Sequence, residues 1–194
     1  MADTAVILNG WERALMAGER VQQRLRRATR ALDGAGVPYA VVGGNAVAEW
    51  VGRIDEEAVR NTCDVDLLIR RTDFPAARTA LEAAGFVHRQ LLDVETFIDG
   101  PEGRPSGGVY IIFAGEKVRS SDEQSAPGVE DSERASEFQV AKLEALVRMK
   151  LSAWRDKDRM HLRDLMSVGL IDATWRDRLP PPLDQRLQEL LDNG

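Results

Sequence analysis

Two aspartates stand one residue apart where an apolar run begins, in the stretch NTCDVDLLI at residues 61–69. Residues 67–69 predict a buried strand, in which a charged side chain is costly unless something pairs with it. Residues i and i+2 of a strand project to the same side, so Asp64 and Asp66 would stand together. Two like charges this close repel unless a cation lies between them. The pair therefore indicates a site for Mg²⁺ (or Mn²⁺), because such cations take hard oxygen ligands.

A glycine pair precedes these aspartates, in the stretch VVGGNA. Residues 37–42 predict a short buried strand, and Gly43 and Gly44 then turn the chain into a helix. Glycines at such a turn let the backbone approach an anion, and the helix amino terminus offers free N–H groups, to which Asn45 could add a donor amide. Plainer explanations stay open. An ordinary tight turn is the more frequent role of a glycine pair, and Asp64 could simply solvate a loop end.

A lysine lies on a later predicted helix, in the stretch RMKLSAWRDKD. The neighbours of Lys150 are apolar, and lysines commonly snorkel from core-facing helices, so considered alone this residue would be structural. Beside a triphosphate and a metal ion, Lys150 would instead be the natural counter-charge.

The order of predicted elements indicates an α+β (α/β) fold, with a small mixed β-sheet flanked by helices and a helical C-terminal segment. The periodicity predicts helices over residues 11–32, 45–51, 72–85, 140–154, 158–168 and 183–191, and strands over residues 37–42, 64–69, 86–92 and 109–113. We expect a core with its N-terminal helix over residues 1–114, a polar loop or connector over 115–136, and helices packed on the core over 137–194.

Composition narrows the classes of function. The net charge of −6 argues against general adhesion to nucleic acid. Arginines are nevertheless concentrated in residues 20–30, and basic residues in 148–163. These stretches could be solvated helix faces, which is the plainer explanation, or a local basic rim that faces a polyanion. The single cysteine, Cys63, excludes a disulfide framework and fits a reducing cytosol. No stretch looks like a signal peptide or a membrane span, so we expect a cytoplasmic protein. His88 and His161 are too isolated to suggest a zinc or acid–base site, and we expect surface or satisfied core roles.

The stretch GGNAVAEWVGRIDEEAVRNTCDVDLL resembles the signature of the nucleotidyltransferase superfamily, which has the polymerase-β-like fold. A lysine followed by an arginine and a Lys-Asp pair also resembles the C-terminal segment of its minimal nucleotidyltransferases and AbiEii-type toxins. The residues that carry the likeness to these two groups are Arg60, Thr62, Asp64, Asp66, Lys150, Arg155, Lys157 and Asp158.

The resemblance implies an activity. Asp64 and Asp66 would be catalytic and hold Mg²⁺ on a nucleoside triphosphate, a glycine-led nucleotide site would grip its phosphates, and Lys150 would neutralise them. An acceptor hydroxyl would attack the α-phosphorus and release pyrophosphate. The acceptor could be RNA, with tRNA among the known types, or a protein or a small molecule, and the protein could be the toxin of a toxin–antitoxin pair with an antitoxin partner. The residues of the implied nucleotide site are Gly43, Gly44, Asn45 and Lys150.

One position departs from the superfamily pattern. A third carboxylate usually stands on a later strand, and alignment of VYIIFAGEKVR places Tyr110 there. Tyrosine can neither complete a metal site nor take a proton at neutral pH. Asp93 or Glu95 could substitute from the adjacent weak strand. An alternative function is therefore a nucleotidyltransferase-fold protein that binds nucleotide, or regulates a partner, without catalysis. A third is an interaction module in which the aspartates have no ligand.

Overall fold

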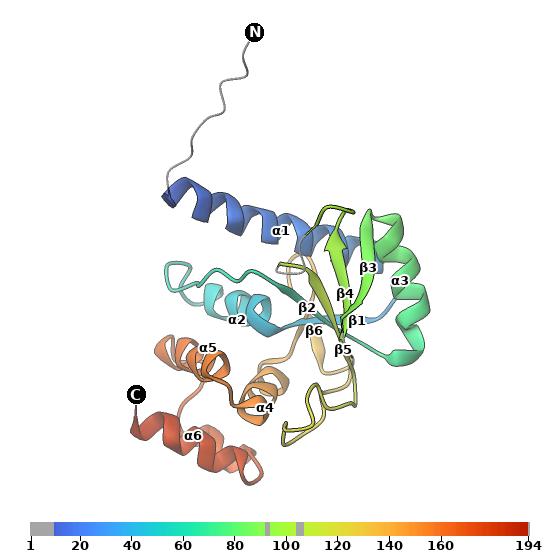
Figure 1. Cartoon of the computed structure of the whole chain (residues 1–194). Coiled ribbons are helices and arrows are strands. Elements are labelled where there is room, and N and C mark those ends of the chain that lie inside the picture. Colours follow the sequence, from blue (N-terminus) through green and yellow to red (C-terminus); the bar gives the residue numbers. More distant parts are fainter. Residues whose placement is uncertain (1–9, 92–93, 104–106, 194) are drawn as a thin grey trace.

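The computed structural model describes residues 10–91, 94–103 and 107–193 (Figure 1). The helices are α1 Gly10–Gly34, α2 Gly43–Gly52, α3 Phe74–Ala83, α4 Leu143–Ala153, α5 Asp156–Ser167 and α6 Leu183–Asp192, with short 3-10 turns at Arg71–Asp73 and Ala173–Arg178. The strands are β1 Tyr39–Val42, β2 Val65–Ile69, β3 Phe86–Leu91, β4 Val94–Asp99, β5 Val109–Phe113, β6 Ser132–Arg134 and β7 Gln139–Ala141.

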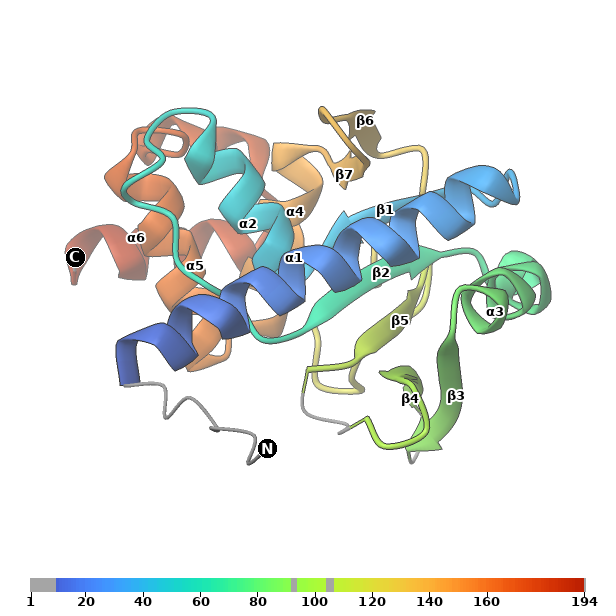
Figure 2. The same ribbon diagram turned by 90° about the horizontal axis from the view of Figure 1, so that it is seen from above.

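The strands form one mixed sheet in the order β3-β4-β5-β2-β1-β7-β6. β2 runs parallel to β5 and β1 runs parallel to β7, and the other neighbours are antiparallel. β2 lies at the centre, and Leu67, Leu68 and Ile69 are fully buried, as expected for a strand covered on both faces. Figure 2 shows α1 crossing over β1 and β2, and α1 also contacts α3. The predicted fold class, a mixed sheet flanked by helices, is confirmed.

The C-terminal helices form a layer of their own. α4 contacts both α5 and α6, and α2 joins this layer by packing on α4 and α5 (Figure 1). Because α2 also packs on β1 and β2, it links the sheet to these helices. No helix in the described part of the chain is long and apolar enough to cross a membrane.

Three strands, β4, β6 and β7, are not predicted from the sequence, and one helix begins later than predicted. β4 pairs antiparallel with both β3 and β5 but is not predicted, because Leu92 and Asp93 before it carry no glycine or asparagine turn signal. The helix predicted over residues 140–154 begins later, at Leu143, because Val140 belongs to β7 and pairs with β1. An apolar pair such as Val140-Ala141 fits a strand and a helix equally well, so its partner strand determines the outcome.

Candidate active site

The turn from β1 into α2 packs against β2, the strand that carries Asp66. Gly43 has a φ of +66°, the left-handed region that favours glycine. A Cβ atom added to Gly43 would lie 1.9 Å from Oδ2 of Asp66, and one added to Gly44 would lie 2.7 Å from Oγ1 of Thr62. Gly43 therefore permits close approach of the turn to β2, and Gly44 permits close approach to the segment that leads into β2.

The two aspartates line one cavity of about 590 Å³, together with Gly43 and Gly44. Asp64 lies just before β2 and accepts a hydrogen bond from the Gly107 backbone N–H (3.0 Å). Asp66 is the second residue of β2 and pairs with Val42 across the sheet. Asp64 is thus outside the strand, as the plainer explanation supposed, yet it shares a cavity with Asp66.

The charge of Asp66 is costly where it stands. Surrounding protein atoms raise the pKa of its carboxyl, the charges of Lys150 and Lys157 partly oppose this shift, and the neighbouring charge of Asp64 adds to it. A cation between the two aspartates would offset both the burial and the repulsion.

Asn45 is buried on α2 and is turned toward the aspartates. Its Nδ2 atom donates a hydrogen bond to the backbone carbonyl of Asp64 (2.7 Å), and its Oδ1 atom has no partner among the described residues. The side chain therefore fixes the main chain at Asp64, a contact that the sequence did not indicate.

Lys150 is only 6% exposed and lines the same cavity from α4. Its Nζ atom donates to Oδ1 of Asp158 (3.1 Å), and Arg155 Nε donates to Oδ2 of the same carboxylate (2.5 Å). Burial lowers the pKa of Lys150, while the charges of Asp158 and Asp66 oppose that shift. Burial would raise the pKa of Asp158, but Arg155 and Lys150 hold it below its usual value. The lysine therefore stands between two carboxylates, one on α5 and one on β2.

The corner between α4 and α5 is formed by Trp154, whose φ of +52° is unfavourable for a bulky residue. The guanidinium groups of Arg159 and Arg186 lie 5.5 and 5.6 Å from its ring centroid. These contacts hold the corner that brings Asp158 to Lys150.

Tyr110 stands beside Asp66 in the parallel register of β5 and β2 and lines the cavity. Burial and the charges of Asp64 and Asp66 raise its pKa, so the phenol is neutral at neutral pH. The prediction that Glu95 could replace the missing carboxylate is wrong. Thr96 pairs with Tyr110, so Glu95 projects to the opposite face of the sheet, where it bonds to His88 (2.6 Å). Asp93 lies outside the described residues.

A second cavity, of about 520 Å³, adjoins the first and shares Gly44, Asp64 and Lys157 with it. His161 lines this cavity and is buried, but its Nδ1 atom has no partner within the described chain, so the expected satisfied core histidine is not what the structure shows. Burial and the nearby charges of Lys150 and Lys157 lower its pKa to about 4.

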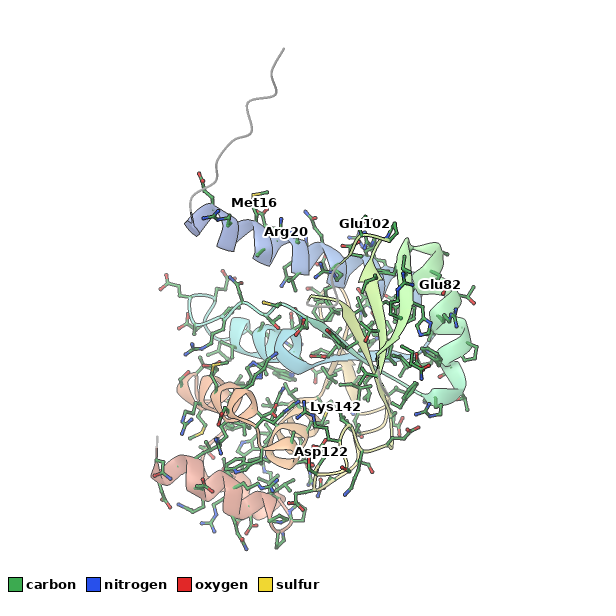
Figure 3. All side chains as sticks on the ribbon, viewed as in Figure 1. Met16, Arg20, Glu82, Glu102, Asp122 and Lys142 are labelled. Atoms are coloured by element: carbon green, nitrogen blue, oxygen red, sulfur yellow. The ribbon has the colours of Figure 1, made fainter. Side chains whose placement is uncertain are left out.

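Ion pairs partly neutralise the arginine-rich helix α1. Arg24 and Arg27 pair with Asp99, and two further arginines, Arg26 and Arg30, pair with Glu137. Figure 3 shows Arg20, the remaining arginine of this group, in the N-terminal half of the helix. These pairs give most of the basic stretch a structural role and weaken the case for an RNA-facing rim.

The donor set fits a metal ion that is shared with a ligand. Asp64 and Asp66 supply two hard oxygen donors, and the described residues contain no cluster of three or more potential metal-binding side chains. Mg²⁺ is commonly bound in this way, by one or two carboxylates together with phosphate oxygens and water.

The mixed sheet, with a glycine turn packed against Asp66 and two aspartates in one cavity, fits the nucleotidyltransferase class that the sequence resembles. The chain matches the family described as uncharacterised nucleotidyltransferase over residues 7–190, and it belongs to that family. Its fold is similar to a solution structure of the antibiotic-resistance factor ANT(2'')-Ia, with a TM-score of 0.54 and 16% identity over 92% of this chain and 100% of that one. A crystal structure of ANT(2'')-Ia in complex with adenylyl-2''-tobramycin gives a TM-score of 0.53 and 15% identity, over 90% and 98% of the two chains. A comparison with curated proteins gave no significant match. The narrower likeness to AbiEii-type toxins stays a prediction.

Proposed function

We propose that this protein is a Mg²⁺-dependent enzyme that moves a nucleoside monophosphate from a nucleoside triphosphate to an acceptor hydroxyl. The observation that carries the proposal is the convergence of three features on one cavity: the glycine turn, the aspartate pair and the buried Lys150. Such substrates would be met in the cytoplasm, which is where we expect the protein to work.

Each residue has a distinct task in this scheme. Asp64 and Asp66 would hold Mg²⁺, which when bound would neutralise charge on the triphosphate. The free N–H groups at the start of α2, where Gly43 and Gly44 let the backbone approach closely, would bind phosphate oxygens. Lys150 would balance the negative charge of the phosphates. Asn45 would act by keeping the main chain of Asp64 in place, rather than by contacting phosphate.

The chemical step is an in-line displacement. The acceptor oxygen bonds to the α-phosphorus, the bond from that phosphorus to the bridging oxygen breaks, and pyrophosphate leaves with the electron pair. The hydroxyl proton passes to water, because the neutral phenol of Tyr110 cannot accept it. Catalysis would then depend on positioning and charge neutralisation.

A small molecule is the acceptor class that we favour. Two adjoining cavities of about 590 and 520 Å³ suit small ligands, and four arginines of α1 are already engaged in ion pairs. The similar fold of ANT(2'')-Ia was captured with an adenylylated small molecule, adenylyl-2''-tobramycin. A tRNA or protein acceptor, with an antitoxin partner, is the competing possibility.

Label transfer from α-labelled nucleoside triphosphates tests the proposal and separates these acceptors. The reaction contains Mg²⁺, with total tRNA, the protein itself and tobramycin as parallel acceptors. We expect transfer by the wild type and none by a folded Asp64→Asn variant. Equal labelling by both proteins would reject the proposal. If only tRNA is labelled, the acceptor is tRNA and not a small molecule.

Tyr110 motivates a second candidate function, nucleotide binding without catalysis. Calorimetry separates the two candidates. The second predicts Mg²⁺-dependent nucleotide binding that requires Asp66 but releases no pyrophosphate with any acceptor, and brisk turnover by the wild type would exclude it.

A further inference from the structure

Asp122 is a buried carboxylate with an open acceptor position. It lies in the segment between β5 and β6, is 6% exposed and lines the same cavity as the aspartate pair. Its Oδ2 atom accepts a hydrogen bond from the Arg119 backbone N–H (3.2 Å), whereas its Oδ1 atom has no partner among the described residues. A buried carboxylate oxygen without a donor is costly, so a donor from a ligand would be favourable there.

The other carboxylates of this cavity are already engaged. Glu116 accepts two hydrogen bonds from Arg71, each of 2.6 Å. Asp158 is held by Lys150 and Arg155, and the aspartate pair stands at the proposed metal site. Asp122 is therefore the carboxylate of the cavity that remains available to a second part of a ligand.

The segment around Asp122 is fixed to the C-terminal helices. Glu123 pairs with Arg186 of α6 (2.7 Å), and the Gln124 backbone N–H donates to Oγ of Ser152 on α4 (2.7 Å). Figure 3 shows Asp122 beside α4. A carboxylate that is held in place and can only accept hydrogen bonds is suited to reading an N–H group.

A single ligand could contact both the glycine turn and Asp122, because both line the same cavity. The lining combines apolar side chains, such as Ile112 and Met149, with charged and polar ones, and Asp122 is the described lining residue with a buried side-chain oxygen that no donor fills. Apolar side chains of this kind can pack on a flat ring, and a well-placed polar group can then orient the ring.

We propose that Asp122 reads the nucleobase by accepting a hydrogen bond from an exocyclic amino group. Bases with an amino group are then favoured over their oxo counterparts, whose oxygen would face the carboxylate. The inference rests on the proposed function, because it takes the nucleotide phosphates to lie at the glycine turn.

Calorimetry with Mg²⁺ and α,β-methylene analogues of CTP, UTP, ATP and ITP tests this inference. Within each pair, cytosine with uracil and adenine with hypoxanthine, the exocyclic group changes from amino to oxo. We expect the wild type to bind the amino member of at least one pair about tenfold to a hundredfold more tightly, as for a hydrogen bond to a charged group. Asp122→Asn should abolish or reverse that preference, because its amide can donate to the oxo group. Glu130→Gln, an exposed change in the same segment but outside the cavity, should preserve it.

The outcomes separate this inference from the proposed function. If the wild type binds nucleotide in an Asp64-dependent manner but without an amino preference, or if Asp122→Asn keeps the preference, the reading of the base is wrong and the proposed function stands. If the wild type binds none of the four analogues, both fail. The wild-type comparison alone is sufficient should Asp122→Asn not fold.

Discussion

Gly43 and Asp66 are in such close contact that no other residue type fits at position 43. A Cβ atom there would lie 1.9 Å from Oδ2 of Asp66, and the backbone φ of +66° is itself unfavourable for any residue with a side chain. The turn that would hold phosphate and the carboxylate that would hold metal are thus parts of one packed contact.

Gly43→Ala should therefore cost both stability and activity. The left-handed angle alone costs about 1–2 kcal/mol. The clash with Asp66 adds to this and moves the carboxylate, so we expect nucleotidyl transfer to fall to background. Gly36→Ala is the matched control, because Gly36 has the same φ of +66° and open space around its Cβ position. Urea unfolding should show a larger loss of stability in Gly43→Ala than in Gly36→Ala, and label transfer should be lost only in Gly43→Ala. Equal activities would contradict the role of the contact.

Mg²⁺ should stabilise the wild type and not a variant that lacks one aspartate. A ligand at a hundredfold excess over its Kd stabilises by about 2.7 kcal/mol. We expect Tm to rise by several degrees with Mg²⁺ and ATP in the wild type, and to stay constant in Asp66→Asn. Without metal, Asp66→Asn should be at least as stable as the wild type at pH 7. The raised pKa of Asp66 means that its contribution to stability is lost as pH rises through the folded value, and asparagine carries no such charge. An equal shift in both proteins would place the metal elsewhere.

His161 should make the protein less stable in weak acid. Its pKa falls from 6.5 to about 4 on folding, so between these pH values the unfolded chain binds a proton at His161 that the folded chain does not bind. The contribution of His161 is complete above pH 6.5 and is lost as pH falls toward 4, by up to about 3 kcal/mol. Urea unfolding at pH 7.5, 5.5 and 4.5 should show this loss in the wild type and in His88→Gln, but a smaller loss in His161→Gln. The same slope in all three proteins would show that His161 is accessible to protons.

Lys150→Met should weaken nucleotide binding. The change keeps the length of the buried stem but removes the charge that faces Asp66, so we expect the Kd for Mg-ATP to rise by about tenfold to a hundredfold. Lys142→Met, at an exposed position just before α4, should bind as the wild type does. Calorimetry measures both constants, and unchanged binding in Lys150→Met would return this lysine to a purely structural role.

Tyr110→Asp should increase the rate of pyrophosphate release. The register places residue 110 beside Asp66, so an aspartate there would add a third oxygen donor and a proton acceptor. Tyr110→Phe removes only the hydroxyl and should leave the rate unchanged. If the wild type releases pyrophosphate faster than Tyr110→Asp does, the phenol itself contributes to the reaction.

Much of this architecture can be read from local patterns. The strand that contains Leu67 and the helix that follows Gly43 are both predicted, because apolar periodicity and glycine punctuation are properties of short segments. β4 is missed for the complementary reason. Its residues become a strand through pairing on both sides, and that pairing is not local information.

The site was less predictable than the fold. Spacing places Asp64 and Asp66 together, but it cannot show that Asn45 holds the main chain of Asp64 or that Asp158 is the partner of Lys150. Those contacts depend on how helices cross, and no sequence signal marked Asp122, which lies in a polar segment among other charged residues. Glu95 was a reasonable candidate by distance along the chain, and only the alternation of side chains on β4 excludes it.

The corner at Trp154 couples remote parts of the chain. Glycine would turn the backbone there at no conformational cost, yet the chain uses a large ring braced by Arg159 and by Arg186 from α6. The distance between Lys150 and Asp158 of α5 therefore depends on how α6 packs against this corner. Damage to α6, which also buries Leu183, Leu187 and Leu190 in the core, would then disturb the position of Lys150 without altering any residue that lines the cavity.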